Sequence, residues 1–253
     1  KEIEKESIIN NAHAGSEFVV LFFLYEKIYE KGSLGKDILM RDYNPVDQSE
    51  KDGKLAETLR FWIEHGLFQE EKNKIKIAEK YCSETLDEDL IFSKVCQCIF
   101  DAAEGKDIDS DKTIVPLFRV LVPLLGSEKW SVDKEINPDG LEKFHDKIWR
   151  GVGEGFKANR SNVASPALEI SYLLGFLEKS VSSDGYHVDP TRAVRSILPA
   201  IFDKNPELRV QEFISAIENM IPILEGGPFA KKIKAILNEQ QKINPDIKSL
   251  ALN

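Results

Sequence analysis

The hydrophobic and polar positions between residues 16 and 80 follow a three-helix, two-strand order. An apolar stretch with helical spacing opens at Ser16 and stops at Gly32, and Pro45 closes a shorter helix after it. Two runs of alternating apolar and polar residues then flank the polar turn 71–74. The elements are expected at 16–31, 34–43, 54–66, 67–70 and 75–78. Three helices followed by a hairpin predict a winged helix-turn-helix, a fold that usually meets DNA or another protein.

The third of these helices has two distinct faces at 100° per residue. The apolar face, expected to pack against the protein core, consists of Leu55, Leu59, Trp62 and Ile63. We expect Trp62 to pack under the first helix at Phe22 or Phe23. The opposite face, expected to be exposed, carries Glu57, Arg60, Phe61 and Glu64. Two carboxylates against one guanidinium do not suit a helix that lies in a phosphate-lined groove.

Two kinds of contact therefore remain open for this unit. Residues 54–80 hold six basic and five acidic side chains. The basic ones gather only around the turn of the expected hairpin, residues 72–76, which is called the wing of this fold. The residues expected to contact DNA are Lys72, Lys74, Lys76 and Arg60. The residues expected to dock a partner protein, or the chain's own C-terminal part, are Glu57, Phe61 and Glu64. A third interpretation makes Phe61 a half-exposed edge of the core.

The remaining chain is patterned as helices. The expected helices span 88–104, 113–126, 141–156, 190–203, 207–224 and 228–241, and one more begins at 165. Start signals stand at Asp189-Pro190, Asn205-Pro206 and Asn244-Pro245, and Ser180–His187 is expected to be a loop. The fold class is thus mainly α. We expect a winged helix-turn-helix at 1–82 and an all-α domain at 83–253, with a partial second winged helix in 188–253.

Composition and charge narrow the function classes. The chain has 253 residues and a net charge of −9, which argues against a general nucleic-acid coat but not against a local basic patch. The longest apolar run, Phe18–Tyr25, is too short to span a bilayer, and no secretory signal pattern is visible, so a cytoplasmic protein is expected.

No combination of residues predicts catalysis. The three cysteines are expected to be small buried hydrophobic residues, the histidines are scattered, and we expect no metal and no cofactor. The acidic segment 105–112 lacks the central glycine and the terminal glutamate of a calcium loop. Residues 151–155 lack the ending of a phosphate-binding loop. Arg192 and Arg195 lie three residues apart and can hold an anion, although ion pairs with Glu207 or Asp203 are the simpler expectation.

Three strings in the second half resemble the DpdG family. They are Ser171-Tyr-Leu-Leu-Gly-Phe176, His187-Val-Asp-Pro-Thr-Arg-Ala-Val-Arg-Ser-Ile-Leu-Pro-Ala-Ile-Phe202 and Ile221-Pro-Ile-Leu-Glu-Gly-Gly227. The family is encoded with the bacterial systems for 7-deazaguanine DNA modification and restriction, the Dpd systems. The resemblance implies an accessory part in such a defence system, beside helicase and nuclease partners, and it implies no catalytic residues. Glu225 stands where the family pattern has Asp.

We therefore expect a non-enzymatic accessory subunit of a DNA-modification or anti-phage defence complex, which acts by protein docking and weak DNA contact. The first alternative is a winged-helix transcriptional regulator, for which a homodimer and a basic reading face are expected. The second alternative is an enzyme with an unrecognised site.

Overall fold

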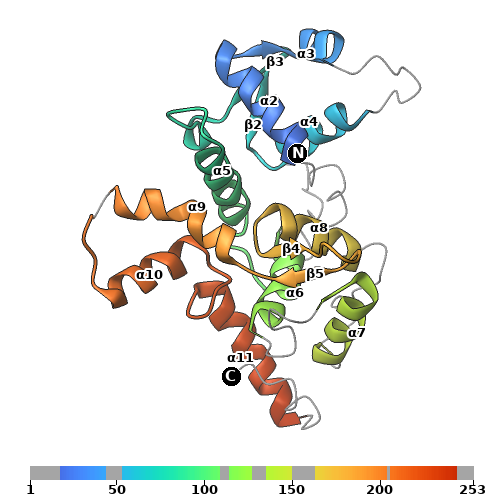
Figure 1. Ribbon diagram of the computed structural model, residues 1–253, viewed down its shortest axis with the longest axis vertical. Coiled ribbons are helices and arrows are strands. Elements are labelled where there is room, and N and C mark those ends of the chain that lie inside the picture. Colours follow the sequence, from blue (N-terminus) through green and yellow to red (C-terminus); the bar gives the residue numbers. More distant parts are fainter. Residues whose placement is uncertain are drawn as a thin grey trace.

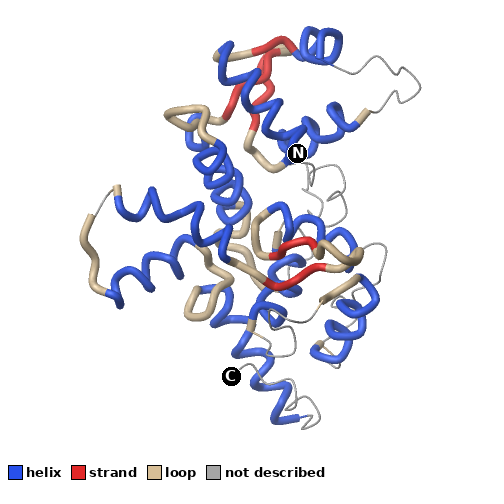
Figure 2. Tube along the Cα trace, viewed as in Figure 1, coloured by secondary structure: helices blue, strands red, loops and turns tan. Residues whose placement is uncertain are grey.

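The computed structural model describes residues 18–43, 53–108, 114–126, 135–149, 163–203 and 206–243. It is mainly helical, as the sequence predicts, with short strands in two places (Figures 1 and 2). The expected helix start at Asn244-Pro245 and the glycine-rich segment 151–155 lie outside the described residues. So does the polar segment before Ser16.

The N-terminal unit, residues 18–81, is built from three helices and a small antiparallel sheet. Its elements are α2 (Phe18–Lys31), β1 (Leu34–Gly35), α3 (Lys36–Tyr43), α4 (Lys54–Glu64), β2 (Phe68–Glu71) and β3 (Lys74–Ile77). The sheet order is β1-β3-β2, and Leu34 pairs with Ile75. The helix and hairpin order predicted from the sequence is confirmed. The two residues of β1 were expected to belong to the second helix, which instead begins at Lys36.

A tight turn closes the hairpin between β2 and β3. Both central residues, Lys72 and Asn73, have positive φ angles of 49° and 64°. This backbone matches the two-residue turn whose twist fits antiparallel strands, and Asn is a residue that tolerates it well. The polar turn predicted at 71–74 is therefore confirmed.

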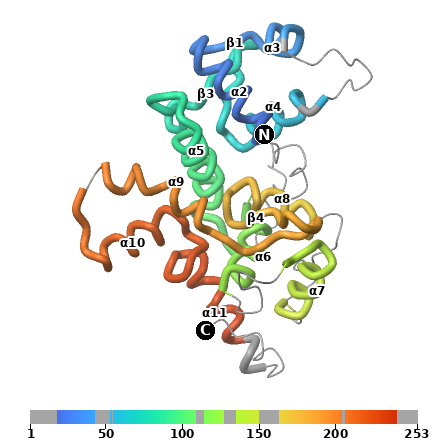
Figure 3. Tube along the Cα trace, viewed as in Figure 1, coloured from blue at the N-terminus to red at the C-terminus, as the bar shows by residue number. Residues whose placement is uncertain are grey.

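Helix α5 (Glu88–Asp101) joins the N-terminal unit to the rest of the chain (Figure 3). The connecting segment, which includes the 3-10 turn η2 (Glu79–Tyr81), is held to α2 by two tyrosines. The buried hydroxyl of Tyr25 donates to the Tyr81 carbonyl and accepts from the Ser83 amide, both at 2.7 Å. The Tyr29 hydroxyl donates to the Glu84 carbonyl at 2.8 Å. These bonds fix where α5 leaves the unit.

The rest of the described chain is a helical body, residues 88–243. After α5 it contains α6 (Val115–Leu125), α7 (Pro138–Ile148), α8 (Ser165–Leu173), α9 (Thr191–Phe202), α10 (Val210–Met220) and α11 (Pro228–Ile243). Helix α6 is almost entirely buried and packs against α8 and α11. Helix α9 packs on α5, and α10 packs on α9, so that the α9–α10 pair projects from the body (Figure 1).

The helical body is not all α, which corrects the sequence-based expectation. Strands β4 (Leu177–Lys179) and β5 (Tyr186–Val188) form an antiparallel hairpin, and Tyr186 also bridges to Ile136. The expected loop, 180–187, covers the turn and also the first two residues of β5. The strands are only three residues long, so no alternating pattern could develop in the sequence.

Two expected helix starts also differ from the structure by three residues. Pro138 opens α7, with the Asn137 side chain accepting from the Gly140 amide, so this helix starts three residues before the expected position. Asn205-Pro206 does not start α10, which begins at Val210. The Glu212 carboxylate accepts a hydrogen bond from the Arg209 amide at 3.0 Å, which gives this amide a partner just before the helix.

Candidate functional site

Helix α4 is the element for which the sequence predicted contacts with DNA or protein. Its core face is confirmed, since Trp62, Leu59 and Leu55 are 0%, 1% and 5% exposed. Helix α2 packs against α4, and Trp62 is a core residue as predicted. Phe22 and Phe23 of α2 are only partly buried at the edge of this core.

The expectation that Phe61 is exposed is wrong. Its ring is 2% exposed, stacks on His65 with 4.2 Å between the ring centroids, and meets Trp62 edge-on. Helix α5 reaches the C-terminal end of α4, where the Cys98 thiol lies 3.3 Å from the His65 carbonyl oxygen. The apolar periodicity indicated one buried face, whereas Phe61, which the same periodicity places opposite Leu59, is buried as well. Phe61 therefore offers no surface to a partner, and Ile63 is half-buried instead of being in the core.

The exposed side of α4 lines a hollow of about 340 Å³ between α3, α4 and β2. Met40, Ala56, Leu59 and Ile63 provide its apolar surface. The charged lining residues are Lys36, Glu57, Arg60, Glu64 and Glu70. Lys36 and Glu70 pair at 2.8 Å, which leaves two carboxylates and one guanidinium among the described lining residues. The outer face of α4 is therefore concave and slightly acidic.

The wing lysines are not equivalent. The ammonium of Lys76 pairs with Glu71 at 3.0 Å. Lys72 and Lys74 are exposed, and neither has an ion pair among the residues that the structure describes. The wing also rests on α3, because the Asn73 side chain donates to Asp37 at 2.6 Å and its carbonyl accepts from the Lys36 amide. Only two of the three expected cations are thus open to a phosphate, and Arg60 lies on α4 beside the hollow.

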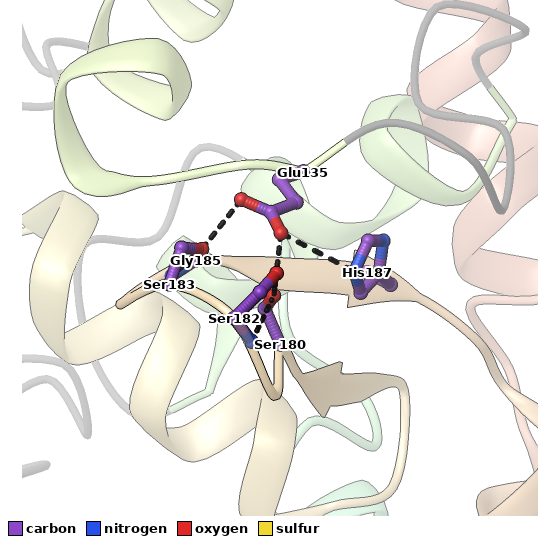
Figure 4. A network of polar contacts seen from close by, with 6 residues as sticks. All are labelled: Glu135, Ser180, Ser182, Ser183, Gly185 and His187. Atoms are coloured by element: carbon purple, nitrogen blue, oxygen red, sulfur yellow. Dashed lines mark hydrogen bonds and ion pairs between the residues drawn. The ribbon is translucent and has the colours of Figure 1, made fainter.

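A second polar cluster surrounds Glu135, just before α7 (Figure 4). The hydroxyls of Ser180 and Ser183 donate to its two carboxylate oxygens, and the His187 ring nitrogen lies 3.7 Å from one of them. These hydrogen bonds lower the pKa of Glu135, with the Ser180 bond as the largest cause. Both hydroxyls are directed at the carboxylate and not at the imidazole, so the cluster does not present a serine activated by a base. It ties the start of α7 to the β4–β5 turn.

Two of the three cysteines behave as predicted. Cys96 and Cys98 are buried, whereas Cys82 is exposed. Burial raises the pKa of the Cys96 thiol to about 12, which keeps it protonated. Among the described residues, no group of three or more His, Cys, Asp or Glu side chains is placed to hold a metal ion. Within the same part of the chain, no helix has the length and apolar character to cross a membrane.

The family model of DpdG-like proteins matches residues 6–251, nearly the whole chain. The chain belongs to the DpdG-like family. The family name associates this DpdG-like protein with the Dpd systems. No curated protein and no solved structure matches the chain.

The strings that carried the resemblance form one junction in this DpdG-like protein. Gly175 ends α8 with a φ of +75°, and a Cβ there would lie 2.8 Å from the Ala193 amide nitrogen. That amide donates to the Gly175 carbonyl, so the turn after α8 is seated on the start of α9. The Asp189 carboxylate accepts from the Thr191 amide, as the predicted start signal requires. These residues fix where α8 ends and where α9 begins.

The two arginines of α9 are also part of this junction. Both guanidinium groups already have partners among the described residues, so neither is available to bind an anion. Arg192 donates to the Tyr172 carbonyl at the end of α8, and its guanidinium lies over the Phe92 ring at 4.8 Å. Arg195 pairs with Asp89 of α5 at 3.3 Å. The expected ion pairs with Glu207 or Asp203 are therefore wrong, because α9 turns these side chains toward α8 and α5.

Proposed function

We propose that this chain is a non-enzymatic accessory subunit of a bacterial Dpd defence system and that its N-terminal unit is a winged helix-turn-helix used to dock another protein. The helix order, the sheet order β1-β3-β2 and the tight turn at Lys72 and Asn73 support the winged-helix assignment. The family match supports the association with a Dpd system.

The hollow on α4 is the observation that carries the docking role. A helix that reads DNA presents a convex, cationic surface to the major groove, where phosphates line both rims. Here the corresponding surface is a recess with the carboxylates of Glu57 and Glu64 at its edge. An apolar recess with a charged rim is a common arrangement at protein interfaces. The chemistry of this face thus favours a protein partner with basic side chains.

The proposed partners are other subunits of the same defence system, helicase or nuclease components among them. DNA contact is secondary in this proposal and runs through Lys72 and Lys74, the exposed lysines of the wing. Two phosphate contacts give weak binding with a log-log salt slope of roughly −1.8.

Co-purification tests the docking role. A tagged chain is co-expressed with each Dpd protein encoded beside it, and the complexes are isolated by size-exclusion chromatography. We expect Glu57→Lys/Glu64→Lys to lose a complex that the wild type forms. Glu30→Lys/Glu84→Lys makes the same charge change at exposed positions away from the hollow and is expected to keep it. A complex that survives the first variant, or no complex with the wild type, contradicts the proposal.

The wing also supports a second candidate function, a DNA-binding transcriptional regulator. Lys72 and Lys74 are exposed at a turn that winged-helix proteins often lay along the DNA backbone. This candidate requires tight, sequence-dependent binding that Lys72→Ala/Lys74→Ala abolishes. A fluorescence-anisotropy titration against several DNA sequences separates it from the weak, sequence-independent contact of an accessory subunit.

A further inference from the structure

A second and larger cavity lies in the helical body, away from the hollow on α4. It measures about 440 Å³, is partly open to solvent, and is lined by residues of α5, α9, α10, α11 and the segment that joins the last two helices. This size lies within the range of about 300–1,000 Å³ that is typical of small-molecule sites. None of the functions considered above uses it.

The floor of the cavity is apolar and fixed. Cys96, Phe100, Ile197 and Phe229 line it and are 2%, 7%, 3% and 6% exposed. The rings of Phe100 and Phe229 both contact Phe118 of the buried helix α6, with centroids 5.9 and 4.9 Å away. Because Phe118 packs against both rings, they present a fixed apolar surface to the cavity, which suits the apolar body of a ligand.

Three uncharged polar side chains line the same cavity. Ser93 and Gln97 lie one turn apart on α5, and Asn219 comes from the end of α10. No hydrogen bond to any of the three is formed within the described part of the chain. A hydroxyl and two amides offer both donors and acceptors, so together they match a ligand edge that also presents both.

The charges around the cavity cancel. Glu104 and Lys232 are both exposed lining residues with opposite sign. The carboxylate of Asp101 is occupied by Lys80 at 2.7 Å and by the Tyr81 hydroxyl at 3.0 Å. None of the described lining residues is an arginine. The cavity therefore lacks the cationic cluster that binds phosphate or another anion.

We propose that this cavity binds an uncharged planar heterocycle whose edge carries an adjacent hydrogen-bond donor and acceptor, as a lactam does. The ring body lies on the phenylalanine floor, and the lactam edge bonds with Gln97 and Asn219. The site is also linked to the N-terminal unit, because Asp101 lines the cavity and accepts from Lys80 and Tyr81 of that unit. The proposal does not depend on the docking role of α4.

Nuclear magnetic resonance with a defined probe tests the proposal. The probe is quinazolin-4(3H)-one, an uncharged bicyclic lactam, added to the full chain labelled with ¹⁵N. We expect saturable shifts confined to amides of residues 93–105 and 219–232. The comparator is 1-naphthoate, which has a similar ring size and a negative charge, and it is expected to bind more weakly. No saturable shift at millimolar lactam, or tighter binding of the naphthoate, overturns the proposal.

A pair of matched variants tests the polar edge. Gln97→Leu/Asn219→Leu removes both amides from the cavity and is expected to weaken lactam binding about tenfold, as the loss of two hydrogen bonds implies. Gln69→Leu/Gln211→Leu also removes two side-chain amides, at exposed positions outside the cavity, and is expected to leave the affinity unchanged. Thermal melts establish that each variant folds. Equal affinity of the two double variants overturns the assigned edge.

Discussion

Helices α4 and α10 are both eleven residues long and amphipathic, yet they differ in how far their apolar faces are covered. In α4 the buried side chains are Leu55, Thr58, Leu59, Phe61 and Trp62. No residue of α10 is buried, and Val210 and Ile214 remain 70% and 45% exposed. A hydrophobic stripe therefore shows which face of a helix is apolar, but it does not show whether another element covers that face.

The apolar faces of α4 and α10 are covered to different extents because α4 has more neighbouring elements than α10. Helix α4 packs against α2 and β2, and its end meets α5 through His65. Helix α10 packs mainly on α9, where Phe202 and Phe213 stack. We expect the N-terminal unit to contribute much of the free energy of unfolding and α10 to contribute little.

The largest expected effect is the difference in unfolding free energy between a substitution in α4 and one in α10. Trp62→Ala removes a fully buried ring from α4 and should cost about 3–5 kcal/mol of unfolding free energy. Phe213→Ala removes a half-buried ring from α10 and should cost about 1 kcal/mol, since most truncations outside a core are mild. Urea unfolding of both variants measures the difference. Equal costs would show that α10 is held as firmly as α4.

The second effect concerns pH and the core of the helical body. Burial, together with the nearby charge of Arg119, lowers the pKa of His145 from 6.5 to about 3. The unfolded chain therefore takes up this proton first, and acid favours unfolding. The contribution is fully present above about pH 6.5 and is lost as the pH falls toward 3. Between pH 6.5 and 4.5 the loss should be roughly 2–3 kcal/mol.

Replacing the imidazole isolates this contribution. His145→Phe keeps a ring in the site and has no titrating group, so its stability should fall less steeply with acid than that of the wild type. Urea unfolding at several pH values from 7 to 4.5 gives the two curves. Parallel curves would mean that His145 is protonated as readily in the folded protein as in the unfolded chain.

The third effect tests how the N-terminal unit is joined to α5. Tyr25→Phe deletes a buried hydroxyl that serves both Tyr81 and Ser83, and the two backbone groups lose their partner. We expect a cost of about 1–3 kcal/mol. Tyr29→Phe deletes one exposed bond to Glu84 and should cost about 0.5 kcal/mol. Thermal melts of the two variants measure both costs. A larger cost for Tyr29→Phe than for Tyr25→Phe would contradict a buried junction.

The smallest effect is expected on α10. Ile214→Ser places a polar group at an exposed apolar position and should change the unfolding free energy by no more than about 0.5 kcal/mol. Differential scanning calorimetry is sensitive enough to detect a larger change. A loss of about 2 kcal/mol would reveal that the face of α10 is covered in solution.

The sequence predicted those features that depend on local chemistry. The helix and hairpin order of residues 16–80, the turn at Lys72 and Asn73, and the cap at Asp189 all follow from positions close together in the chain. The burial of Trp62 followed from its spacing to Leu59 and Leu55.

Features that depend on distant partners could not be predicted from one sequence. Phe61 is buried although the periodicity of α4 places it on the polar face, and nothing near residue 61 in the sequence signals its burial. The β4–β5 strands are too short for a pattern and rely on pairing with each other and with Ile136. Arg195 faces Asp89, more than one hundred residues away. The hollow on α4 likewise arises from three separate elements.

DNA binding by Glu57→Lys/Glu64→Lys tests most directly the claim that the face of α4 is built for protein and not for DNA. Fluorescence anisotropy with duplex DNA at low and high salt compares this variant with the wild type. We predict tighter, sequence-independent binding by the variant, because the change replaces two negative charges with two positive ones beside the hollow. A carboxylate that reads DNA accepts a hydrogen bond from cytosine, and its loss weakens binding to the preferred sequence. Sequence-specific binding by the wild type that the variant loses would contradict the account.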